Sequence, residues 1–319
     1  MTTTGFLVAR DGARAAALRG AVIAIGNFDG VHRGHRAVIA VARERAGELG
    51  CPAAVLTFEP HPRTFFHPRE ALFRLTDEAI KLRLLAATGL DGAIVLTFDA
   101  ALAGLTAGEF VASILVGRFA ARGVVIGFNF QFGKGRSGSP AFLAAAGKEH
   151  GFAVDVVPPL MDRGRPIASG PIREALSLGR PQEAAELLGY AWFISGAVTH
   201  GYKRGRDLGF PTANIRLDPN CRLRLGIYAV RAQVEGVRYG GVASFGRRPM
   251  FADGSLLLEV FLFDFAGDLY GRALDVAFIG WIRDEQVFAS VDDLVRRMED
   301  DAREARAILA RVADTFPVQ

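Results

Sequence analysis

The chain has only two cysteines among its 319 residues, Cys51 and Cys221, and they lie far apart. Neither belongs to a paired Cys-x-x-Cys spacing, which argues against a disulfide framework and against a structural zinc site. No apolar run approaches membrane-spanning length, and the N-terminus lacks a basic segment followed by an apolar one. We therefore expect a reduced cytoplasmic protein with no membrane partner.

Strong charge of either sign is also missing, because 38 basic residues nearly balance 34 acidic ones. A net charge of +4 without clusters suits anionic metabolites and gives no reason to expect nucleic acid. Both the Walker pattern G-x-x-x-x-G-K-[ST] and the protein-kinase signatures are absent. The length exceeds that of most single cores, so two domains are expected. An oligomer is possible but not required.

Segments with strand and helix patterns alternate in the first half of the chain. The predicted strands are 21–25, 53–58, 93–98, 123–126 and 152–157, and the predicted helices are 34–49, 77–88, 107–121 and 139–149. Glycine at position 50 is a candidate C-cap for the first helix. This alternation predicts an α/β fold with a doubly wound parallel sheet.

The pattern changes after a short helical stretch at 172–188. Residues 227–234 and 237–246 flank Glu235-Gly236 and read as a hairpin, and two further strands are predicted at 256–265 and 273–282. Residues 290–312 form one amphipathic helix with Ser290 as its N-cap. These elements predict a small antiparallel β-barrel with a C-terminal helix. The expected domains are 1–186 and 187–319.

The turn after the first strand carries the strongest functional signal. It contains Gly26, Asn27, Phe28, Asp29 and Gly30, and it is followed by His32 and His35. A helix start leaves backbone N–H groups unpaired and carries partial positive charge, so it binds anions. Residues three apart share one helical face, so both imidazoles can reach the same phosphate. We predict a nucleotide triphosphate site with His32 and His35 as its catalytic residues.

Other strand ends of the predicted sheet add candidate ligand-binding residues. The second strand runs into Glu59-Pro60-His61-Pro62, and the fourth runs into the loop FNFQFGKGRSGS. That loop has Phe128, Asn129, Phe130 and Phe132 beside two cations, which suits a planar ring near phosphates. Further on, Ser169 and Arg173 open a helix where an arginine can clamp a polyphosphate. For the loop the alternative is a basic surface loop without a ligand, and for Arg173 it is an exposed helical arginine.

In the second half, residues 201–215 combine glycines, cations and an extended Pro-Thr-Ala-Asn segment. The candidate nucleotide-binding residues there are Gly205, Arg206, Gly209, Pro211 and Thr212. Thr212 and Asn214 alternate on the extended segment and offer the oxygen ligands that Mg²⁺ prefers. Glu259 interrupts an apolar strand, where a carboxylate is disfavoured unless it has a partner or a role. Glu259 is the candidate general base, the alternative being a solvated strand face.

These motifs, in order and spacing, resemble the bifunctional bacterial riboflavin kinase/FMN adenylyltransferase (FAD synthetase) family. The matching segments are GNFDGVHRGH, TFEPHP, GFNFQFGKGRSG, PTANI, GIYAV, GVASFGRRPMF and LEVFLFDFAGDLYG. The resemblance implies phosphorylation of riboflavin to FMN and adenylylation of FMN to FAD, with ATP as substrate and Mg²⁺ as cofactor. It further implies that His32 and His35 contact the triphosphate and that Asn27 and Asp29 shape the turn. His61, Asn129 and the phenylalanines would border the flavin, and Glu259 would deprotonate the ribityl hydroxyl.

Two segments depart from the family pattern. One reads GRRPMF where the family usually has GTRPTF, and the other precedes Ile172 and Arg173. Where the family has roughly SSTxIR, this chain has Ala168-Ser169-Gly170-Pro171-Ile172-Arg173, so two hydroxyl positions are lost. Hydroxyls at a helix start cap it and contact phosphate. The alternative reading is therefore a riboflavin kinase with a catalytically weakened N-terminal domain. A flavin-binding carrier without turnover is a second alternative, although binding alone needs no base such as Glu259.

Overall fold

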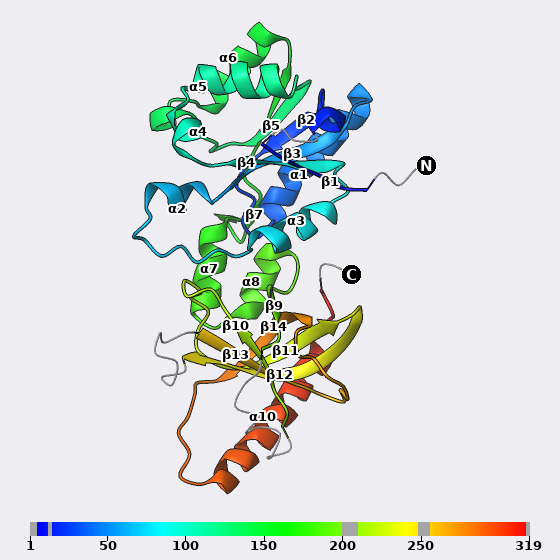
Figure 1. The fold of residues 1–319 in the computed structure, drawn as a ribbon, viewed down its shortest axis with the longest axis vertical. Helices are drawn as coiled ribbons and strands as arrows, with labels where there is room; N and C mark the ends of the chain where they lie inside the picture. Colours follow the sequence, from blue (N-terminus) through cyan, green and yellow to red (C-terminus); the bar gives the residue numbers. More distant parts are fainter. Residues whose placement is uncertain (1–4, 12–14, 200–209, 248–255, 317–319) are drawn as a thin grey trace. The chain divides into compact units, whose positions relative to one another are not determined.

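The computed structural model describes residues 5–11, 15–199, 210–247 and 256–316 (Figure 1). The chain forms two compact units. The first consists of Met1–Leu72 and Thr76–Ala168, and the second of Phe73–Leu75 and Ser169–Gln319. Within the described ranges no helix is both long and apolar enough to cross a bilayer. Cys51 and Cys221 are both free.

The first unit is built on a six-stranded sheet in the order β1-β4-β3-β2-β5-β6, and every adjacent pair is parallel. The strands are β1 (Leu7–Arg10), β2 (Val22–Ile25), β3 (Ala53–Glu59), β4 (Gly92–Thr97), β5 (Gly123–Gly127) and β6 (Ala153–Val157). The predicted parallel sheet is confirmed. Sequence reasoning missed β1, an edge strand of four residues that pairs only with β4.

Helices cover both faces of this sheet (Figure 1). They are η1 (Ala15–Leu18), α1 (Arg33–Leu49), α2 (Pro62–Phe66), α3 (Glu78–Ala86), α4 (Ala100–Gly104), α5 (Ala107–Glu109), η2 (Phe110–Arg118), η3 (Lys134–Arg136) and α6 (Pro140–His150). A small hairpin, β7 (Met161–Asp162) and β8 (Arg165–Pro166), follows β6. Gly50 ends α1 in the left-handed conformation, as predicted. The predicted helix 107–121 is instead a short α-helix that continues as the π-helix η2.

The second unit begins with two helices, α7 (Ser169–Ser177) and α8 (Pro181–Leu188). The expected single helical stretch at 172–188 is interrupted because Gly179 is left-handed at φ 72° and a proline starts α8. By their contacts, both helices belong to the second unit. The boundary expected at residue 186 falls near the end of α8, and it stays a prediction.

A six-stranded antiparallel sheet in the order β10-β13-β12-β11-β14-β9 forms the rest of this unit. The elements are β9 (Phe193–Ala197), β10 (Ala213–Arg216), β11 (Gly226–Val234), β12 (Val237–Arg247), β13 (Leu256–Leu262), β14 (Ala273–Arg283) and α10 (Val291–Arg311). A bridge between Thr199 and Asn214 joins the two edges of the sheet. The sheet is therefore nearly closed, as the predicted barrel requires.

Local sequence rules explain two elements of the barrel unit. Glu235 and Gly236 have φ values of 48° and 84°, the positive angles that a two-residue hairpin turn between β11 and β12 needs. Ser290 caps α10 by accepting from the Asp293 N–H at 3.1 Å. The apolar side of α10 packs on the outer face of the sheet around Phe263.

Candidate nucleotide and flavin sites

The turn from β2 into α1 is folded around one buried aromatic side chain. Phe28 adopts a φ of 50° and is 1% exposed, and its ring meets the His35 ring edge-on at 5.3 Å. Gly30 follows with a φ of 81°, which glycine adopts without strain. Anchoring Phe28 in the core therefore bends the backbone so that α1 begins directly after the turn.

His32 and His35 lie against one another at the start of α1. Their rings stack with centroids 3.6 Å apart and planes 16° from parallel. His32 is the N-cap, and its Nδ1 accepts a hydrogen bond from the His35 backbone N–H at 3.2 Å. A Cβ on Gly34 would lie 3.2 Å from the His32 ring, so the glycine between the histidines permits this packing. The two imidazoles are brought together as predicted, and their contact with phosphate stays a prediction.

Burial and neighbouring groups keep the His35 imidazole uncharged at neutral pH. Burial lowers the pKa of His35 well below its ordinary value of 6.5, and the nearby His32 and Lys81 lower it further. Its Nδ1 is enclosed and has no hydrogen-bond partner. The residue as a whole is half-buried, so a phosphate oxygen would meet the accessible part of the ring and not this nitrogen.

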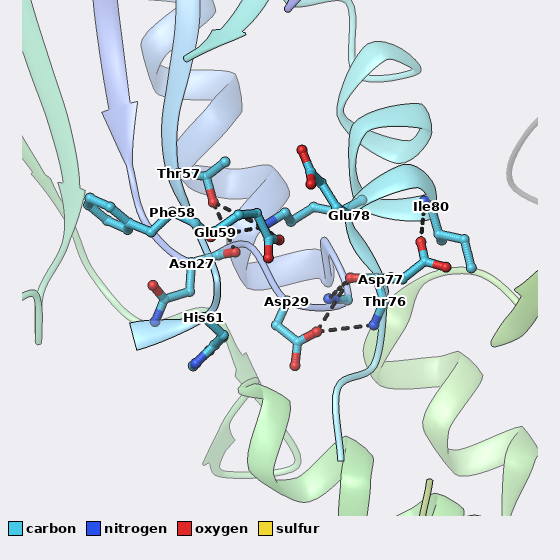
Figure 2. Close-up of polar contacts among 12 residues, drawn as sticks. Asn27, Asp29, Thr57, Phe58, Glu59, His61, Thr76, Asp77, Glu78 and Ile80 are labelled. Carbon is cyan, nitrogen blue, oxygen red and sulfur yellow. Dashed lines mark hydrogen bonds and ion pairs between the residues drawn. The ribbon is translucent and has the colours of Figure 1, made fainter. Parts of the chain in front are cut away.

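Asp29 ties the turn to the beginning of α3 (Figure 2). Its carboxylate is 3% exposed and accepts hydrogen bonds from Thr76 N at 3.1 Å and Thr76 Oγ1 at 3.3 Å. The Gly30 N–H donates to Thr76 Oγ1 at 3.1 Å. The expectation that Asp29 shapes the turn agrees with these contacts. Thr76 was missed, because its role depends on a partner 47 residues away.

The end of β3 lies beside the same turn, since β2 and β3 are parallel neighbours (Figure 2). His61 follows β3 and caps α2, its Nδ1 accepting from Arg63 N at 3.1 Å. Lys81 of α3 reaches Glu59 at 2.7 Å with a side chain that is 2% exposed. Sequence reasoning missed Lys81, although a lysine among the buried positions Ile80, Leu84 and Leu85 of one helix was the available signal.

The predicted flavin loop follows β5, and its aromatic side chains differ in exposure. Phe128 is 46% exposed and Asn129 is also exposed, whereas Phe132 is 9% exposed and packs against Phe110. Phe130 stacks on Phe132 at 5.4 Å. We therefore expect Phe132 to support the loop rather than to face a ligand. The flavin contacts of Phe128, Asn129 and Phe130 stay predictions.

Ser169 and Arg173 lie on α7, which belongs to the second unit. Arg173 Nε donates to the Phe73 carbonyl at 2.6 Å, and Trp192 Nε1 donates to the Leu75 carbonyl at 2.8 Å. Phe73–Leu75 is thus held within the second unit by two side chains. The contribution of Ser169 and Arg173 to the triphosphate site stays a prediction.

In the barrel, strand register aligns polar side chains in a row. Glu259 of β13 pairs with Asn214 of β10 on one side and with Ser244 of β12 on the other. Directly paired residues share a sheet face, so the three side chains are neighbours. Glu259 is half-buried, and Asn214 is 5% exposed. Ser244 was missed because only the register reveals it.

The residues predicted to hold Mg²⁺ offer oxygen atoms that are suitable metal ligands. Asn214 Nδ2 donates to the Thr212 carbonyl at 3.4 Å, so its amide oxygen is the atom available to a cation. Together with the Thr212 hydroxyl this gives hard oxygen ligands, which fit a nucleotide-bound Mg²⁺. In the described residues no group of three His, Cys, Asp or Glu side chains is placed to form a protein-only metal cage. Pro211 is exposed, and Gly205, Arg206 and Gly209 lie outside the described residues.

The first unit thus has a stacked histidine pair at a helix start, and the barrel has a row of polar side chains on one face. Two family models match the chain, FAD synthetase over residues 14–170 and riboflavin kinase over residues 188–309. The chain belongs to the bifunctional riboflavin kinase/FMN adenylyltransferase family.

Full-length relatives support this assignment. The chain is 43% identical over 293 residues to the bifunctional riboflavin kinase/FMN adenylyltransferase of Pseudomonas fluorescens, covering 92% of this chain and 94% of that one. It is 41% identical over 288 residues to that of Escherichia coli K12, covering 90% and 92%. Among solved structures, a Streptococcus pneumoniae protein named as a macrolide-efflux protein is similar, with a TM-score of 0.83 and 31% identity. That match covers 97% of this chain and 100% of the other.

The lowered pKa of His35 predicts how stability depends on pH. An unfolded histidine has a pKa of about 6.5, so below about pH 6.5 the unfolded chain binds more protons than the folded one. The free energy of unfolding should therefore fall as pH decreases from about 6.5 toward the folded pKa.

Urea unfolding across this pH range, for the parent and for His35→Asn, measures the effect. The dependence should be shallower in His35→Asn, because the variant has no imidazole to protonate. Superimposable pH dependences would contradict the assignment of a buried neutral imidazole.

Proposed function

We propose that this chain makes FMN from riboflavin and ATP, and then FAD from FMN and a second ATP, releasing pyrophosphate. The observation that supports this best is that each matched half contains its own candidate site. The first half has the stacked His32–His35 pair at the start of α1, and the second has the Asn214–Glu259–Ser244 row. Membership of the family supplies the substrates.

In the first unit, an FMN phosphate oxygen attacks the α-phosphorus of ATP while the bond to the β-phosphate oxygen breaks. Pyrophosphate leaves, and no covalent enzyme intermediate is needed. The protein contributes positioning and stabilisation of the charge on the phosphate oxygens. The N–H groups at the start of α1 and the neutral His35 ring are the donors that we assign to this role.

In the second unit, the Glu259 carboxylate accepts the proton of the ribityl 5′-hydroxyl as that oxygen attacks the γ-phosphorus of ATP. ADP is the leaving group. Asn214 and Ser244 flank Glu259 in the register and orient groups around it. Mg²⁺, held by Thr212 and Asn214, would neutralise charge on the ATP phosphates.

We further propose a cytoplasmic location, which agrees with two free cysteines and no disulfide between them. The partners are the small molecules riboflavin, FMN and ATP. The kinase-only alternative rests on the two hydroxyl positions lost at Ala168 and Gly170, where α7 begins. Pyrophosphate release from FMN, ATP and Mg²⁺ separates the two readings, and its absence in the parent would favour the alternative.

Glu259→Gln tests the general base of the kinase. The amide keeps the size of the side chain but cannot accept the proton, so riboflavin phosphorylation should slow by a factor of about 10² or more. Chromatography of riboflavin, FMN and FAD after incubation with Mg-ATP measures it. Adenylylation of supplied FMN is the internal control and should be unchanged. A parental kinase rate in Glu259→Gln would remove this residue from the mechanism.

A double variant tests the helix-start site. His32→Asn keeps a side-chain acceptor for the cap, and His35→Ala removes the second imidazole. FAD formation should fall by a factor of about 10² or more, as expected when an oxyanion donor and a positioning group are lost. FMN formation by the other unit should stay at the parental rate. Undiminished FAD output would refute the assignment of the adenylylation site.

A further inference from the structure

Lys81 is almost completely buried in the first unit, with 2% of its side chain exposed. Lysine is among the residues least often enclosed unless it is paired. Its Nζ lies 2.7 Å from Glu59 Oε1, 3.3 Å from Thr57 Oγ1 and 3.5 Å from the Phe58 carbonyl. All three acceptors belong to the last residues of β3. The ammonium group therefore binds the end of the strand that leads into His61.

The same ammonium is connected to the turn that precedes α1 through the Thr57 hydroxyl. Thr57 is fully buried, and its hydroxyl accepts from Lys81 and donates to the Asn27 carbonyl at 3.2 Å. Figure 2 shows Thr57 and Glu59 next to this turn, with His61 beyond the strand end. One buried charge thus contacts the 59–62 segment directly and the 26–30 turn through a single hydroxyl.

The helix that carries Lys81 is fixed independently of the lysine. Asp77 caps α3 by accepting from Ile80 N at 2.7 Å, and the preceding Thr76 is held by Asp29. The backbone of α3 is therefore already joined to the 26–30 turn. The backbone of α3 therefore fixes the starting point of the Lys81 side chain independently of the contacts that this side chain makes with β3.

Stability alone does not explain this ion pair. Buried ion pairs are frequently replaceable by apolar residues of similar volume without loss of stability, because burying two charges is costly. The Lys81–Glu59 pair adjoins both histidine-bearing segments of the predicted site. The charge of Lys81 also acts on the predicted site, since it is among the groups that oppose protonation of His35.

We propose that Lys81 is a positioning residue for FMN adenylylation. Its buried ammonium, paired with Glu59 and bonded to Thr57, fixes the turn before α1 and the segment after β3 relative to each other. This inference rests on the function proposed for the first unit. It adds a residue that contacts neither ATP nor FMN and acts through the groups that do.

The first experiment compares Lys81→Met with the double variant Lys81→Met/Glu59→Met. The single variant leaves Glu59 without its buried partner and is expected to fold poorly, whereas the double variant removes both charges and keeps similar volume. In the folded double variant kcat for FMN adenylylation should fall by about 10²-fold, since loss of alignment acts on turnover. The KM values should change far less, and riboflavin kinase turnover should match the parent. Parental kcat for adenylylation in a folded double variant would overturn the proposal.

The second experiment follows the His35 imidazole by NMR titration without ligands. The groups that act on its charge are His32, the N-cap of α1, and Lys81 on α3. Glu59 is the ion-pair partner of Lys81. Lys81→Gln should raise the pKa of His35 because a positive charge is lost. Glu59→Gln should lower it because the compensating negative charge is lost.

Lys148→Gln, at an exposed position on α6, is the control for the same change in net charge and should leave His35 unaffected. If the pKa of His35 moves in the same direction in Lys81→Gln and Glu59→Gln, or does not move in either, the electrostatic coupling is contradicted. This titration needs neither ATP nor FMN. A parent protein that makes no FAD would refute the proposed function, and the titration would still report on Lys81.

Discussion

The backbone N–H groups at the start of α1 are the constraint on which the first site depends. Four such groups have no partner inside a helix, so the chain must supply them with acceptors or leave them for a ligand. His32 satisfies the N–H of His35, and stacking of the two rings follows from that bond. Asp29 and the buried Phe28 hold the turn in the shape that places His32 at the cap. The Arg36 N–H is also satisfied within the chain, by the His32 carbonyl.

The second site depends on register rather than on a helix. Asn214, Glu259 and Ser244 become neighbours because β10, β13 and β12 pair antiparallel with fixed partners. A slip of one residue in β13 would turn Glu259 to the opposite face. Phe261, on the same face of β13 as Glu259, packs against the cluster that contains Ala302 and Ala305 of α10, and this contact favours the observed register. The two candidate sites thus depend on different physical means, a capped helix start in one and strand register in the other.

Sequence reasoning succeeded where local rules decide the structure. The parallel sheet, the hairpin at Glu235-Gly236, and the caps at Gly50 and Ser290 all follow from short-range patterns. It failed for β1, whose four residues carry too little pattern to distinguish a strand from a loop. Thr76, Lys81 and Ser244 were missed for another reason: each is defined by a partner distant in sequence. The packing of Phe132 against Phe110 likewise depends on a residue outside the loop, and its contact with flavin stays a prediction.

The central claim is that the start of α1 receives the triphosphate of ATP in the first unit. Addition of an ATP analogue that cannot be cleaved between its α and β phosphates, followed by NMR of the histidine side chains, tests it directly. We expect the His35 resonances to shift and the pKa of His35 to rise, because a polyanion then offsets the burial that lowers it. Unchanged His35 resonances at saturating analogue, with perturbations confined to the surroundings of Thr212 and Asn214, would contradict the account.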